Sequence, residues 1–92
     1  MTTRDQNDTM RTRAEVQAAE EEYFDRYWYV VHRGLGAPAE GKSAADAMRR
    51  KYGPSLEEPI GNPWLEGELR GRLAALRWVL GYDWDDERLT DT

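Results

Sequence analysis

The sequence contains no cysteine and only one histidine. Disulfide bridges are therefore impossible, and zinc sites built from cysteine and histidine are excluded. A chain of 92 residues forms one domain and buries a modest share of its surface. Such domains often gain stability from disulfides, metals or self-association. Self-association is the route that this composition leaves open, so we expect a homodimer.

Positive charge is also scarce, since 13 basic residues face 18 acidic ones and the formal net charge is −5. Domains that bind nucleic acid are usually basic, so we do not expect a nucleic-acid partner. The acidic residues concentrate in Glu15–Asp25 and in Asp83–Thr92. Two interpretations remain: solvated faces that keep the protein in solution, or an acidic surface that docks on a basic partner.

Long apolar runs are absent as well. No uncharged apolar segment approaches the ~20 residues that a membrane-spanning helix needs. The first eleven residues lack the apolar core of a secretory signal. We therefore expect a cytoplasmic protein that does not engage a membrane. Residues 1–12 show no periodic pattern and are predicted to form a disordered N-terminal tail.

Aromatic residues, by contrast, are plentiful. The chain has ten of them, four of which are tryptophan, and disordered chains are poor in such residues. Apolar residues recur at helical spacing over residues 13–33, 44–52 and 63–80. These three predicted helices make up a single helical domain over residues 13–82, followed by an acidic C-terminal tail over residues 83–92.

Local signals mark where each helix begins. Thr12 and Glu15 form a capping-box pattern, and Asn62-Pro63 combines a capping residue with a proline suited to the first turn. Ser43 is the expected cap of the short middle helix. Pro54 to Pro63 is rich in proline, which predicts an extended connector. The fold class is all-α: two long helices packed as a helical hairpin, with a short intervening helix, completed by self-association.

The helix predicted over residues 63–80 has two apolar faces. One carries a leucine stripe, and the other carries small residues between two tryptophans. A glycine inside a helix costs about 1 kcal/mol relative to alanine, and close approach of another helix would offset that cost. The second face is covered within the monomer by the middle helix or the connector, or it binds a second copy or an unidentified partner protein. The candidate interface residues are Trp64, Gly67, Gly71, Ala75 and Trp78.

One segment matches a phosphate-binding pattern. Gly36 to Ser43 reads GAPAEGKS, and in P-loop nucleotide-binding proteins such a loop wraps phosphate groups. That loop should follow a buried strand, whereas this segment follows the end of a predicted helix. We interpret the match as coincidence. Nucleotide or phosphate binding by Gly41, Lys42 and Ser43 remains the alternative function.

No residue stands out as catalytic or metal-binding. His32 lacks a serine or cysteine placed as its nucleophile partner. The aspartates of the C-terminal tail lack the glycine turn and distant glutamate of a calcium loop. We therefore expect neither a cofactor nor enzymatic activity, and the leading hypothesis is a non-enzymatic protein–protein interaction or regulatory accessory protein.

The segment Gly71–Gly81, followed by Trp84-Asp85, resembles the C-terminal part of small uncharacterised proteins of high-GC actinobacteria and their phages. The resemblance covers about a quarter of the chain. It implies a small accessory protein of phage type that acts by binding a host protein. A structural phage component is the second alternative.

Overall fold

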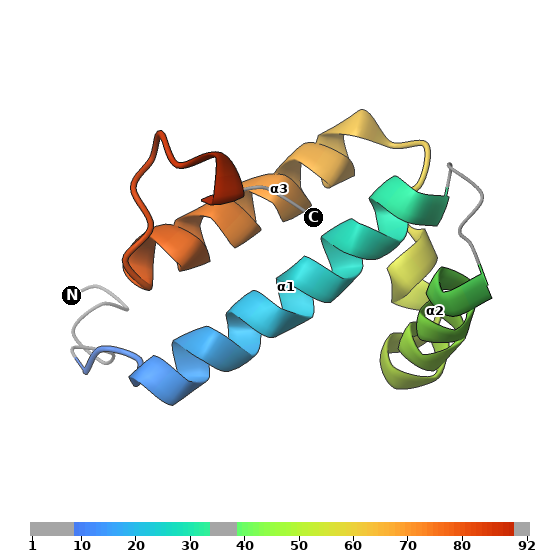
Figure 1. Cartoon of the computed structure of the whole chain (residues 1–92), viewed down its shortest axis with the longest axis horizontal. Helices are drawn as coiled ribbons and strands as arrows, with labels where there is room; N and C mark the ends of the chain where they lie inside the picture. The colour runs from blue at the N-terminus through green and yellow to red at the C-terminus, as the bar shows by residue number, and fades with distance from the viewer. Residues whose placement is uncertain (1–8, 34–38, 90–92) are drawn as a thin grey trace, which may run out of the picture.

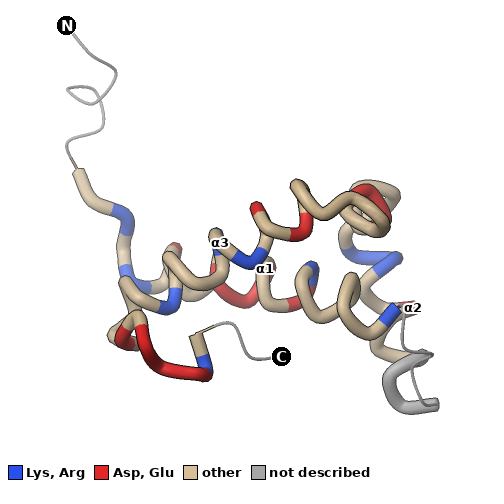
Figure 2. The backbone as a smooth tube through the Cα atoms, turned by 90° about the horizontal axis from the view of Figure 1, so that it is seen from above, with Lys and Arg blue, Asp and Glu red and all other residues tan. Residues whose placement is uncertain are grey.

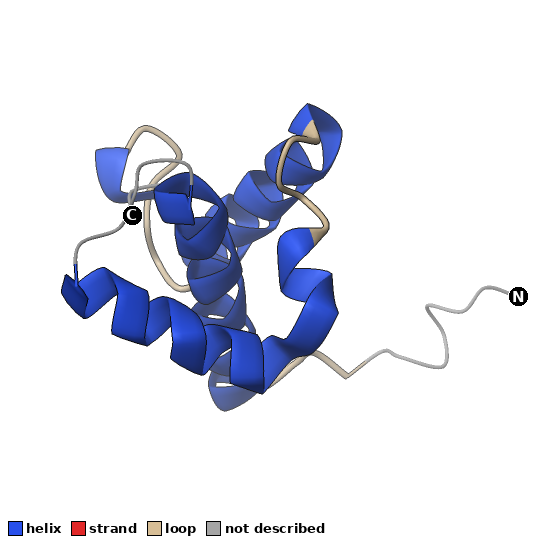
Figure 3. Ribbon diagram, turned by 90° about the vertical axis from the view of Figure 1, so that its right-hand side faces the viewer, coloured by secondary structure: helices blue, strands red, loops and turns tan. Residues whose placement is uncertain are grey.

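The computed structural model describes residues 9–33 and 39–89, and these ranges contain helices and no strand (Figure 3). The α-helices are α1 (Arg13–Arg33), α2 (Ala39–Tyr52) and α3 (Pro63–Val79). Two short 3₁₀ helices, η2 (Gly53–Glu57) and η3 (Glu87–Leu89), complete the described elements. The all-α prediction is confirmed, because α1 and α3 pack against each other along their lengths and α2 lies at one end of the pair (Figure 1).

Both predicted caps of the long helices form. The Thr12 hydroxyl accepts a hydrogen bond from the Glu15 backbone N–H at 3.1 Å, and the Glu15 carboxylate accepts one from the Thr12 N–H at 2.9 Å. The Asn62 side chain accepts from the Leu65 N–H at 3.2 Å. Each cap satisfies N–H groups that the first turn of a helix leaves without an internal partner.

The predicted glycine stop of α3 is also present. Gly81 has a φ of +111°, a backbone conformation that glycine adopts without strain. The Tyr82 N–H donates to the Arg77 carbonyl and the Gly81 N–H donates to the Trp78 carbonyl, both at 3.0 Å. This pair of bonds satisfies two of the last carbonyls of the helix. The corresponding glycine after α1, Gly34, lies outside the described residues.

The predicted start of the middle helix is wrong. Helix α2 begins at Ala39 rather than at residue 44, so Ser43 lies inside the helix and does not cap it. The predicted start rested on Ser43 as the cap, but the helix continues before it through Gly41. One internal glycine costs about 1 kcal/mol, and the neighbouring Ala39, Glu40 and Lys42 are residue types that favour helix.

The connector after α2 is not extended as predicted. Residues 53–57 form η2, with Pro54 in its first turn, where the missing N–H of proline costs nothing. Backbone bonds from the Ile60 N–H to the Glu57 carbonyl and from the Asn62 N–H to the Pro59 carbonyl then turn the chain towards α3. These turns bring Leu56 into a buried cluster with Tyr29 and Ala45.

The core has two parts. Tyr29, Ala45 and Leu56 join α1, α2 and η2, while Leu69 and Leu73 are the buried leucines of α3, which packs along α1. Helix α2 packs on η2 and α1, and α3 packs on α1 and η3. The structure therefore places α2 away from α3. None of the helices in the described ranges combines the length and hydropathy of a membrane-spanning segment.

The C-terminal segment folds back on the domain. Residues 83–89 of the predicted acidic tail turn back beside α3 and end in η3, where Leu89 is buried (Figure 1). The anchor is Arg77, which donates a hydrogen bond to the Arg88 carbonyl at 2.6 Å. The buried side chain of Arg77 thus attaches the end of the C-terminal segment to α3.

Asp86 and Arg88 form a local ion pair within this segment. Hydrogen bonds from the Arg88 guanidinium and from its backbone N–H lower the pKa of Asp86 to about 2. Because this pKa lies below the unfolded value of about 3.9, any stability that the pair contributes is present above about pH 4. It is lost as the pH falls towards 2.

We expect the carboxyl carbon of Asp86 to titrate with a midpoint near pH 2 in an NMR pH series. In Arg88→Ala the midpoint should rise most of the way to about 3.9, because the side-chain bonds are lost and the backbone bond remains. An unchanged midpoint in the variant would show that the ion pair does not form in solution.

Candidate functional site

Helix α3 presents different chemistry on its two sides. The buried side is set by Leu69, Leu73 and Arg77, which are spaced four residues apart. Asn62 and Pro63 fix where the helix begins and thus the rotation of every later residue about the helix axis. The opposite side carries the five predicted interface residues, which we call the exposed stripe: Trp64, Gly67, Gly71, Ala75 and Trp78.

The exposed stripe is open to solvent. Trp64 is 78% exposed and Trp78 is 49% exposed. A Cβ atom built on Gly67 or Gly71 would meet no atom of residues 9–33 or 39–89 within 4 Å. The alternative in which α2 or the connector covers this face is therefore wrong for the described residues. The physical reason is the position of α2, whose contacts are with η2 and α1.

Trp84 extends the stripe at its C-terminal end. Its ring stacks on the ring of Trp78, with centroids 5.3 Å apart and an interplanar angle of 13°. Trp84 itself is 61% exposed, so the two indoles form an aromatic surface open to solvent. The sequence interpretation left Trp84 in the tail, although an isolated tryptophan among acidic residues is a signal that could have drawn attention to it.

The segment that carries Trp84 is rich in acidic residues. Figure 2 shows the acidic positions along the segment after α3. Asp83, Asp85 and Glu87 are exposed, whereas Asp86 is paired with Arg88. The C-terminal end of the exposed stripe is therefore bordered by negative charge.

The glycines of the stripe give a direct test of its exposure. We expect Gly71→Ala to raise the free energy of unfolding by about 1 kcal/mol in dilute solution, because alanine favours helix and its Cβ meets no neighbour. Urea denaturation followed by circular dichroism measures the change. As a matched control, Gly81→Ala should lower stability, since Gly81 has a positive φ. Lower stability of Gly71→Ala would show that its face is in contact within the monomer.

The three residues proposed to bind phosphate do not lie on a loop. The backbone of Ala39–Ser43 belongs to α2, so Gly41, Lys42 and Ser43 lie on a helix that has already begun. Gly36 to Pro38 lie outside the described residues. The strand that precedes such a loop in P-loop proteins has no counterpart in residues 9–33.

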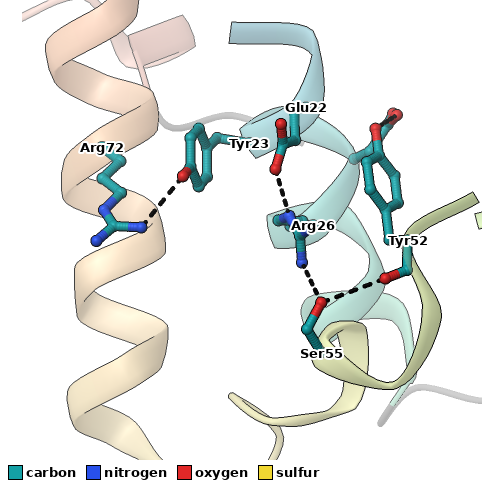
Figure 4. A network of polar contacts seen from close by, with 7 residues as sticks. Glu22, Tyr23, Arg26, Tyr52, Ser55 and Arg72 are labelled. Atoms are coloured by element: carbon teal, nitrogen blue, oxygen red, sulfur yellow. Dashed lines mark hydrogen bonds and ion pairs between the residues drawn. The ribbon is translucent and has the colours of Figure 1, made fainter. Parts of the chain in front are cut away.

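A polar network between α1 and η2 is the other candidate for chemistry (Figure 4). Arg26 donates to Glu22 at 2.8 Å and to the Ser55 hydroxyl at 3.2 Å, and Ser55 donates to the Tyr52 carbonyl at 3.3 Å. Beside this group, Arg72 of α3 donates to the Tyr23 hydroxyl at 3.2 Å. These groups bind one another and join α1 to η2 and to α3.

Two further residues show the same structural role. Burial and a hydrogen bond to Asp25 raise the pKa of Tyr52, so its hydroxyl stays protonated and donates to that carboxylate at 2.8 Å. The His32 ring stacks on Trp28, and its Nδ1 lies 3.0 Å from the Trp28 carbonyl. Within the described ranges, no cluster of three histidine or acidic residues could hold a metal ion.

Comparison of the chain with protein-family models, with curated proteins and with solved structures finds no match.

Proposed function

We propose that this protein is a non-enzymatic interaction module that binds another protein chain through the exposed stripe of α3. The observation that carries the proposal is the exposure of tryptophan on both ends of a helix face that nothing in the described structure covers. Tryptophan supplies large contact area at low entropic cost and is enriched where binding energy concentrates.

The amount of exposed aromatic surface supports a binding role. A tryptophan side chain buries about 150–250 Å² when fully covered. Applied to the exposed fractions of Trp64, Trp78 and Trp84, this corresponds to about 400 Å² of ring surface. This area is divided between the two ends of the stripe, so a partner that covers all of it must lie along the length of α3.

The two glycines add a second line of support. Gly67 and Gly71 weaken an isolated helix by about 1 kcal/mol each, and none of the described residues packs on them to offset that cost. A partner that approaches the backbone of α3 closely would offset it. The accessory role implied by the actinobacterial and phage resemblance is compatible with a small binding protein of this kind.

Photo-crosslinking from the stripe tests this proposal. A benzophenone amino acid in place of Trp64 should form covalent adducts with a protein chain, in the purified protein or in a lysate of the source cells. The same group in place of Ala18, an exposed residue of α1, is the matched control. Equal adduct yields from the two positions, or none from Trp64, would remove the exposed stripe from the proposed function.

A further inference from the structure

The geometry points to a second copy of this chain as the occupant of the exposed stripe, packed antiparallel about a twofold axis beside Gly71. This inference rests on the proposed function and names its partner. It is carried by the spacing of the stripe and by its area.

The stripe is symmetric about Gly71. Gly67 lies four residues before it and Ala75 four residues after it, while Trp64 and Trp78 lie seven residues before and after. Seven residues fall about 20° short of two helical turns. Both tryptophans therefore lie within about 20° of Gly71 around the helix, one on each side.

A twofold interface requires a surface that is complementary to itself. When two copies of α3 run antiparallel through Gly71, Gly71 meets its own copy and Gly67 faces the partner's Ala75. Trp64 then lies against the partner's Trp78, which carries the stacked ring of Trp84. Small residues thus fill the centre, where the backbones come closest, and large rings cover both ends.

The charges on one flank of the stripe are also compatible with this pairing. Glu68 and Arg72 are about half exposed and form an ion pair at 3.4 Å within one chain. In the antiparallel pair, Glu68 lies about 3 Å along the axis from the partner's Arg72, given a rise of 1.5 Å per residue. The same geometry places the two Arg72 side chains about 3 Å apart along the axis, so opposite charges meet at both ends of this flank and like charges meet at its centre. Antiparallel helix dipoles also attract each other.

The exposed area is close to what a dimer requires. A standard interface buries about 800 Å² on each partner, of which somewhat more than half is apolar. The roughly 400 Å² of exposed indole surface approaches that apolar share, before the glycines, Ala75 and Val79 are added. A basic peptide attracted by Asp83, Asp85 and Glu87 is the other occupant that this surface could bind, and the experiment below separates the two.

Disulfide formation between introduced cysteines tests the arrangement. Because the chain contains no cysteine, every disulfide formed must join introduced residues. Gly71→Cys should form an intermolecular disulfide under mild oxidation. Gly67→Cys and Ala75→Cys should link poorly alone and efficiently when mixed, because each faces the other across the axis. Cysteines held together experience effective concentrations near millimolar, so disulfide yields at micromolar protein should exceed those of Ala18→Cys by roughly tenfold or more.

The outcomes are distinguishable on a non-reducing gel. A parallel dimer would link Gly67→Cys and Ala75→Cys each with itself and would overturn the antiparallel arrangement. Yields no higher than those of the Ala18→Cys control, together with a wild-type mass of one chain at every concentration, would overturn the second copy as occupant. The proposed function would survive that result if the crosslinker at Trp64 still captured a different protein, and would fail with it if nothing was captured.

Discussion

We expect Arg77→Ala to lower the free energy of unfolding by about 3–5 kcal/mol, the range measured when one partner of a buried ion pair is removed. The Arg77 side chain is 10% exposed and donates to the Glu20 carboxylate at 2.9 Å, with Glu20 itself 20% exposed. It also donates to the Arg88 carbonyl, and its guanidinium lies 5.3 Å from the Phe24 ring centre. Alanine would leave the carboxylate and the carbonyl without this donor and release the C-terminal segment.

Urea denaturation of matched variants measures this effect. Arg70→Ala, on an exposed position of the same helix, should change stability by less than about 0.5 kcal/mol. The double variant Glu20→Leu/Arg77→Met should lose less than the two single variants together, because neither charge is then left unpaired. A loss below about 1 kcal/mol for Arg77→Ala would contradict the assignment of Arg77 as the residue that joins α1, α3 and the C-terminal segment.

The second large effect is expected at Leu73, which is fully buried. Leu73→Ala should lower the free energy of unfolding by about 2–5 kcal/mol, because the cavity adds to the lost transfer energy. Val79→Ala is the control on the same helix, where the side chain is 56% exposed and the loss should stay below about 1 kcal/mol. Thermal denaturation in dilute solution measures both. Equal losses at the two positions would mean that α3 is not oriented with Leu73 towards the core.

The sequence predicted the long helices well because their end signals are local. Thr12 and Glu15 are three residues apart, and Asn62 bonds to Leu65 in the next turn. Gly81 ends α3 through bonds that span five residues at most. Such signals depend on neighbouring residues and are thus visible without a three-dimensional structure.

The errors arose where a residue's role depends on distant partners or on competing local preferences. The helix predicted from residue 44 leaves out Gly41 and the predicted extended connector includes Pro54, although both positions are helical in the structure. Arg77 has no role in the sequence-based predictions, because its partners Glu20 and Arg88 come from α1 and the C-terminal segment. No pattern within α3 reveals either partner.

Helical spacing identifies the candidate interface on α3, but the sequence does not show what covers it or that Trp84 adjoins it. Helical periodicity places Leu73 on one side of the helix and Gly71 and Trp64 on the other, because the side on which a residue lies follows from its spacing in the sequence. Whether α2 covers that second side depends on the turns at η2, which direct α2 away from α3. Trp84 was missed because its contact with Trp78 depends on the chain reversal at Gly81.

Hydroxyl-radical footprinting of Trp64, resolved by mass spectrometry over a range of protein concentrations, tests the central claim most directly. Met10, at 86% exposure, serves as the internal reference in the same sample. If a second copy covers the exposed stripe, Trp64 is oxidised readily in dilute protein and becomes protected as concentration rises, while Met10 stays reactive. Oxidation of Trp64 at one unchanged rate relative to Met10, at every concentration and in cell lysate alike, would contradict the account.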